Sequence, residues 1–217
     1  MSTVTHGLLA RMIARPGQSA QAELFQQCAL PQARAEPGTL AWYALRFGRE
    51  DYGFFSAFGD EAGRQAHLQG PVAQGLKEKG AQMLRREAEF ARLNILASKL
   101  PATPRASSLG VLLAFKAKAG HEAEVEQFLR DARHMVEEEP DTVAWFALHW
   151  ADRQHYGIFD VFPDLRARNA HLSGRVPREL AKHALQLVGG MPSMKRPEVL
   201  AIHYAQGVTA EAGAQAA

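Results

Sequence analysis

The sequence has little cysteine, no excess of one charge and no long apolar run. Its single cysteine, Cys28, allows no intrachain disulfide, and its place in a helical pattern predicts a buried small hydrophobic residue. Lys and Arg number 25 against 23 Asp and Glu, with no basic run, so we expect neither a nucleic-acid nor a membrane partner. No signal-peptide pattern opens the chain and no segment approaches membrane-spanning length, which predicts a soluble cytoplasmic protein.

Motifs for common metals and cofactors are missing as well. The sequence contains no HxH, HExxH or CxxC spacing and no Gly-rich phosphate loop. We therefore expect neither a metal nor a nucleotide site. With 47% hydrophobic and 22% charged residues, the 217-residue chain has enough apolar material for two small domains or one fused pair.

The most informative feature is a stretch that occurs twice. Tyr52–Gly70 reads YGFFSAFGDEAGRQAHLQG and Tyr156–Gly174 reads YGIFDVFPDLRARNAHLSG, identical at ten of nineteen aligned positions. Each copy begins with an aromatic strand pattern, followed by an Asp in helix N-cap position, an Arg four residues later, a His and a terminal Gly. Similarity continues upstream and downstream over about a hundred residues, which indicates internal duplication.

Each copy is predicted to form a β-α-β-β-α-β unit, the ferredoxin-like pattern. The first unit spans residues 7–99 and the second spans 110–205. A Pro-containing linker, residues 100–109, joins them, and the tail at 206–217, rich in Ala, Gly and Gln, is expected to be disordered.

Both faces of the second strand in each unit are apolar. We expect the face that carries Tyr43, or Phe146 in the second unit, to pack against the helices. The opposite face carries Trp42 or Trp145 and would be exposed unless another sheet covered it. We therefore predict an α+β fold in which two ferredoxin-like units, fused in tandem, pack their sheets face to face through the tryptophan-bearing surfaces as an intrachain dimeric α+β barrel.

This unit order, with an aromatic strand followed by F-x-D and R-x-x-H-L-x-G, resembles the antibiotic biosynthesis monooxygenase family of dimeric α+β barrels, in particular its quinol monooxygenase-like branch. The resemblance covers essentially the whole chain as two tandem copies. It implies a pocket between each sheet and its helices, with a small aromatic phenol or quinol and molecular oxygen as partners and no metal or flavin cofactor. The haem-degrading branch would have an Asn near the first strand, and neither first strand contains one.

The second unit is predicted to hold the more polar pocket. The carboxylate of Asp160 lies within an apolar strand and needs a partner to offset its desolvation, and His171, Arg168 or His149 could serve. Paired with Asp160, His171 would have a raised pKa and one fixed tautomer, an arrangement suited to taking a phenolic proton. Ser56 replaces the Asp in the first unit, so the two pockets are not equivalent.

We accordingly predict that the catalytic residues are His171, Asp160 and His149, and that the substrate-binding residues are Trp145, Tyr156, Arg168, Trp42, Arg46, His67 and Tyr52. Structural alternatives stay open for several of these. His67 and His171 can each stabilise the C-terminus of a helix, and Trp42 and Trp145 can belong to the core. A non-catalytic barrel that binds a small hydrophobic molecule, or has a purely structural role, is the alternative function, and a further homodimer also stays open.

Overall fold

The computed structural model describes residues 3–151 and 153–205, and the tail predicted at 206–217 lies outside them. The first half contains β1 (His6–Ile13), α1 (Ser19–Ala35), β2 (Thr39–Arg46), β3 (Asp51–Phe58), α2 (Glu61–Gln69), α3 (Pro71–Met83) and β4 (Glu89–Lys99). The second half contains β5 (Leu109–Lys116), α4 (Glu122–Glu137), β6 (Ala144–Trp150), β7 (His155–Phe162), α5 (Leu165–Leu172), α6 (Arg175–Leu187), β8 (Ser193–Lys195) and β9 (Glu198–Tyr204).

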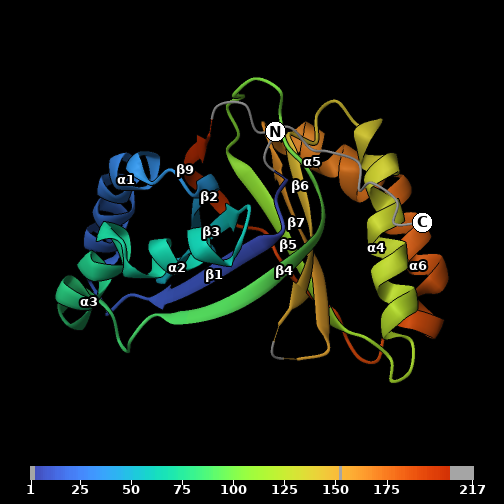
Figure 1. The fold of residues 1–217 in the computed structure, drawn as a ribbon, viewed down its shortest axis with the longest axis horizontal. Coiled ribbons are helices and arrows are strands. Elements are labelled where there is room, and N and C mark those ends of the chain that lie inside the picture. Colours follow the sequence, from blue (N-terminus) through green and yellow to red (C-terminus); the bar gives the residue numbers. More distant parts are fainter. Residues whose placement is uncertain (1–2, 152, 206–217) are drawn as a thin grey trace.

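The strands form a closed ring between two groups of helices. Hydrogen-bonded neighbours run in the order β7-β6-β4-β1-β3-β2-β9-β5, and β5 pairs with β7 to close the ring. Helices α1, α2 and α3 lie on one side of the strands and α4, α5 and α6 on the other (Figure 1). The predicted α+β barrel is therefore confirmed. Within the described residues, no helix is long and apolar enough to cross a membrane.

The last strand of each half joins both halves. Strand β4 pairs with β1 along its first part, from Glu89 to Asn94, and with β6 along its second part, from Leu93 to Lys99. The corresponding segment of the second half is split, so that β8 pairs with β5 while β9 pairs mainly with β2. The two sheets are thus hydrogen-bonded to each other at both edges in addition to packing face to face.

Aromatic side chains from both halves fill the barrel interior. Phe55 lies 4.9 Å from Phe146 and 4.7 Å from Phe159 between ring centroids, and Tyr43 lies 5.3 Å from Phe159. All four side chains are fully buried. Such interlocked aromatic pairs hold the two sheets together.

The predicted assignment of strand faces is therefore wrong: the faces are reversed. Tyr43 and Phe146 face the barrel interior, whereas Trp42 and Trp145 pack against the helices of their own halves. Alternation correctly grouped the residues by face, but it could not tell which layer covers a face when both faces are apolar. The buried positions of α1 include the alanines Ala22, Ala29 and Ala33, which leave room for a large indole.

Helix α1 buries a face that does not include Cys28. Cys28 is exposed and Leu24 is 50% exposed, so the prediction of a buried cysteine is wrong. The buried face instead contains Gln26, whose side-chain amide donates to the carbonyls of Leu45 at 3.2 Å and Gly53 at 2.7 Å. This buried polar residue fixes the position of α1 on the sheet.

Candidate functional site

A histidine near the end of the first short helix ties that helix to the start of the second strand. In the first half, His67 Nδ1 lies 2.5 Å from Glu36 Oε2, which also accepts a hydrogen bond of 2.8 Å from the Thr39 hydroxyl. Gly70, at the end of α2, allows this approach, because a Cβ there would lie 2.6 Å from Glu36 Oε1. The carboxylate selects the tautomer with hydrogen on Nδ1 and leaves Nε2 as an acceptor.

The second half repeats this link with a different partner on the other ring nitrogen. His171 Nδ1 lies 2.6 Å from Glu139 Oε2, and the Thr142 hydroxyl donates to the same oxygen at 2.6 Å. His171 Nε2 lies 3.3 Å from Asp160 Oδ2, whereas His67 Nε2 lies 3.2 Å from the hydroxyl of Ser56. The predicted Asp160–His171 pair is present.

Electrostatics make the second-half histidine a fixed cation. Burial lowers the pKa of His171, but the two carboxylates, Asp160 before Glu139, outweigh burial and raise this pKa to about 10. Burial in turn raises the pKa of Asp160, which is 2% exposed. At neutral pH both ring nitrogens therefore carry hydrogen and face carboxylates. An imidazolium of this kind has no free nitrogen with which to take a proton from a phenol.

The first-half pair, in contrast, borders a cavity. Ser56 and His67 line a small cavity of about 10 Å³, roughly the room that one water-sized group needs. The rest of its wall is apolar and comes from β1, β3, β4, α2 and α3: Leu8, Ala10, Phe54, Leu68, Val72, Ala73, Leu76 and Phe90. The Ser56 hydroxyl and the His67 imidazole are thus the polar side chains of an otherwise apolar chamber.

This chamber adjoins a much larger groove along α3. The groove has a volume of about 670 Å³, within the range of small-molecule sites. Four apolar residues line both the chamber and the groove: Leu68, Ala73, Leu76 and Phe90. The groove therefore has an apolar inner wall that leads towards the Ser56–His67 pair.

The remaining predicted site residues lie elsewhere. His149 stacks on Tyr156 with ring centroids 4.7 Å apart. Asp160 instead lies opposite Trp145, which is four residues from His149 in β6. Four residues of a strand span roughly 13 Å, so His149 does not join the Asp160–His171 pair. The Tyr156 hydroxyl donates to Glu126 at 3.3 Å.

The first half has a similar polar group at the corresponding end of its sheet. Arg46 pairs with Glu23 at 2.5 Å and with Glu198, and the Tyr52 hydroxyl donates to Glu23 at 3.3 Å. Both carboxylates bind the guanidinium, which raises the pKa of Arg46. Arg46 and Tyr52 are therefore held in an ion-pair cluster at the start of α1, away from the Ser56–His67 chamber.

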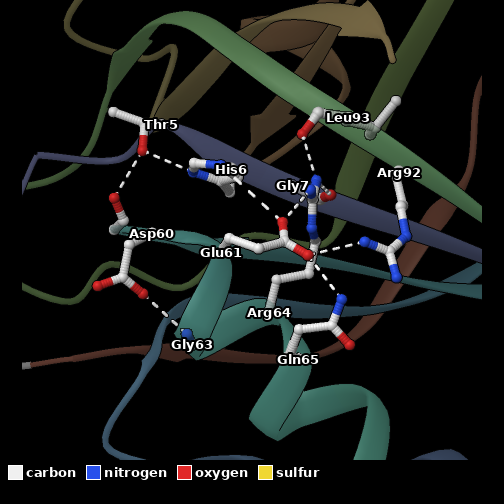
Figure 2. Close-up of polar contacts among 11 residues, drawn as sticks. Thr5, His6, Gly7, Asp60, Glu61, Gly63, Arg64, Gln65, Arg92 and Leu93 are labelled. Atoms are coloured by element: carbon white, nitrogen blue, oxygen red, sulfur yellow. Dashed lines mark hydrogen bonds and ion pairs between the residues drawn. The ribbon is translucent and has the colours of Figure 1, made fainter. Parts of the chain in front are cut away.

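The N-cap prediction is confirmed, and the Arg four residues after Asp60 pairs with other groups. Asp60 accepts from the Gly63 backbone and Asp164 from the Ala167 backbone, both at 2.8 Å. Arg64 instead pairs with Glu61 and donates to the carbonyls of Gly7 at 3.3 Å and Leu93 at 3.0 Å, as Figure 2 shows. Arg64 thus attaches α2 to β1 and β4.

Arg168, the second-half counterpart of Arg64, is only half-buried, and its Nε has no hydrogen-bond partner among the described residues. Trp42 stacks on Phe54 at 5.1 Å and so lies one layer behind the chamber wall. No cluster of three or more His, Cys, Asp or Glu side chains in the described part of the chain is placed to hold a metal ion.

Several solved structures have the same fold as this chain, and two of them are described as putative monooxygenases. A "putative monooxygenase" from Fusobacterium nucleatum matches with a TM-score of 0.82 and 13% identity, over 98% of this chain and 100% of the other. A "putative monooxygenase" from Lactobacillus acidophilus matches with a TM-score of 0.81 and 11% identity, over 96% and 100% of the two chains.

A ferredoxin-fold protein from Listeria monocytogenes, described as related to antibiotic biosynthesis monooxygenases, matches with a TM-score of 0.55 and 9% identity, over 91% of this chain and 95% of the other. No family model matches the sequence, and no curated protein matches it. The resemblance to this family is therefore confirmed at the level of the fold.

Proposed function

Starting from this monooxygenase-like fold, we propose that the chain binds a flat aromatic molecule with a phenol or hydroquinone hydroxyl in the groove of its first half. There it promotes the reaction of that molecule with molecular oxygen, without a bound cofactor. The observation that carries the proposal is the chain Ser56–His67–Glu36 at the inner end of an apolar groove. The site is thus assigned to the first half, in place of the second-half pocket expected from the sequence.

The three residues would act as a proton relay. The substrate hydroxyl, which is the size of the chamber beside Ser56, would donate to the serine oxygen while Ser56 donates to His67 Nε2. Loss of the phenolic proton through Ser56 would leave an imidazolium at His67, which Glu36 stabilises through Nδ1–H. This is general base catalysis with an oriented histidine.

Deprotonation would make the ring electron-rich enough to reduce oxygen directly. For a hydroquinone, one oxygen atom enters the ring and the other leaves as water, so hydroquinone and O₂ give a hydroxyquinone and water. The four electrons all come from the substrate, and the reaction needs no external reductant. The apolar walls formed by Leu8, Phe54 and Val72 keep water away from the anion and admit apolar O₂.

Oxygen uptake with a panel of hydroquinones and naphthols tests this function. Ser56→Ala removes the relay hydroxyl with little change in volume, and we expect the rate with the best substrate to fall about 100-fold or more. Ser98→Ala is the matched control, because Ser98 is also a buried strand serine but lines neither the chamber nor the groove. Equal rates for wild type and Ser56→Ala, or no uptake above background with any compound, would contradict the proposal.

A non-catalytic role is the second candidate. The observation that favours it is the locked His171 cation, since the same histidine link serves only to join elements in the second half. Under this alternative, aromatic molecules would bind in the first-half groove with no oxygen uptake, and Ser56→Ala would leave binding unchanged.

A further inference from the structure

The mouth of the first-half groove is strongly cationic. Four basic residues line it, Arg15, Lys77, Arg85 and Arg86, and Glu87 is the single acidic residue of the lining. The side chains that line the groove carry a formal charge of +3, before Glu50 and Glu89, which pair with Arg85 and Arg86, are counted. Such a concentration of charge around an apolar cleft attracts anions to it.

Two of these cations, Arg15 and Lys77, form no ion pair with a carboxylate of the described residues. Arg85 pairs with Glu50 and Arg86 with Glu89. Arg15 uses only its Nε, which donates to the Leu84 carbonyl at 2.9 Å, so its terminal nitrogens have no partner among the described residues. Within the same part of the chain, Lys77 has no hydrogen bond or ion pair, and its side chain is exposed. Arg15 and Lys77 therefore remain available to an anion.

The inner wall of the groove is apolar. Its lining includes Leu68, Leu76 and Leu84, together with Phe90, which stays 44% exposed. An exposed aromatic ring beside buried leucines is stabilised when an apolar molecule covers it. The groove thus combines an apolar body site with a cationic mouth.

The second half shows that the fold does not require these charges. The bridges Ala14–Leu84 and Ala117–Val188 align the two halves at this place. Aligned in this way, the positions of Arg15, Lys77, Arg85 and Arg86 are occupied in the second half by Lys118, Ala181, Gly189 and Gly190. Three of the four cations are therefore particular to the first half, the half that also has the Ser56–His67 chamber.

We infer that the ligand of the first-half groove is an aromatic carboxylate, with its rings along α3 and its carboxylate held at the mouth by Arg15 and Lys77. The inference rests on the proposed function in taking the groove as the substrate site, and it adds the anionic group to the substrate class. A charge-assisted pair of this kind discriminates an acid from its uncharged amide by about tenfold.

Binding of two isosteric probes, 2-naphthoate and 2-naphthamide, tests the charge. By calorimetry in 20 mM salt we expect 2-naphthoate to bind about tenfold more tightly, and this preference should shrink in 500 mM salt because salt screens exposed charges. Lys77→Gln should weaken 2-naphthoate several-fold and leave 2-naphthamide unchanged. Lys79→Gln is the matched control, because Lys79 is exposed on the same helix but does not line the groove.

A second pair of variants tests whether the two probes bind in the groove. Ala81 is exposed and lines the groove, whereas Gln82 is exposed and does not, so Ala81→Trp should weaken both probes and Gln82→Trp neither. Equal affinity for the two probes, equal effects of the two lysine variants, or no binding of 2-naphthoate would overturn the inference. Oxygen uptake is scored separately: binding of 2-naphthoate with no oxidation of any phenol refutes the proposed function alone, and oxidation without a charge preference refutes this inference alone.

Discussion

The buried cluster Asp160–His171–Glu139 should make the stability of the second half depend on pH. The pKa of His171 rises from its ordinary 6.5 to about 10 on folding. At 1.36 kcal/mol per unit, this shift corresponds to roughly 5 kcal/mol at most, since the desolvation of Asp160 opposes it. A raised folded-state pKa contributes stability that is fully present below pH 6.5 and is lost as the pH rises to 10. About 3 kcal/mol of this upper bound should disappear between pH 6.5 and 9.5.

Asp160→Ser is the informative perturbation, because the first half already has serine at this position. His171 would keep Glu139 as its partner, and we expect a loss of only about 1 kcal/mol at pH 6.5. His171→Gln leaves Asp160 buried beside no cation, which should cost about 3–5 kcal/mol. The double variant should be no less stable than His171→Gln, which implies a coupling energy of about 1–3 kcal/mol.

Urea unfolding of the four proteins at pH 6.5 and 9.5 measures these quantities. We expect wild type to lose stability across this range and Asp160→Ser to lose much less. Additive effects of the two substitutions, or parallel pH profiles for wild type and Asp160→Ser, would refute the assignment of His171 as a buried cation held by Asp160.

Two further substitutions test packing. Gly70→Ala places a Cβ 2.6 Å from Glu36 Oε1 and should reduce the free energy of unfolding by about 1–3 kcal/mol. Gly80→Ala meets only Leu84 Cδ1, at 3.6 Å, and should be neutral or stabilising by up to about 1 kcal/mol. Equal denaturation midpoints for the two variants would contradict this. Phe55→Ala should cost about 3–5 kcal/mol and keep a single unfolding transition for both halves, because Phe55 packs on Phe146 and Phe159; calorimetry that resolves two separate transitions would show that the halves are independent.

The sequence predicted the elements well because their local signals are strong. The two Asp N-caps and the helix end at Gly70 each depend on contacts within a few residues, and the structure has them as expected. The reversal of the strand faces has the opposite origin. Both faces of β2 and β6 are apolar, and the deciding fact, the small alanines on the buried side of α1, concerns a different element.

The sequence also did not predict that the last strand of each half would pair with a strand of the other half. The length of β4, 11 residues, is the one local sign that this strand spans two sheets. The three residues of β8 are all exposed and carry no strand pattern. Pairing between distant strands is decided by the whole barrel, whereas hydrophobic alternation describes one strand at a time.

For the site, sequence reasoning found the Asp160–His171 pair and favoured the second half for a base, whereas our proposal places the base in the first half. A carboxylate beside His171 looked activating, but Asp160 on one ring nitrogen and Glu139 on the other together raise the pKa of His171 to about 10. The cationic groove mouth was missed because its four residues are spread from Arg15 to Arg86 and form no basic run.

The most direct test of the account is a crystal structure of the protein soaked with a hydroxynaphthoate. The account predicts ligand density in the groove along α3, with the hydroxyl within hydrogen-bond distance of Ser56 Oγ and the carboxylate beside Arg15 and Lys77. Density beside His171 instead, or an empty first-half groove in crystals saturated with the ligand, would contradict it.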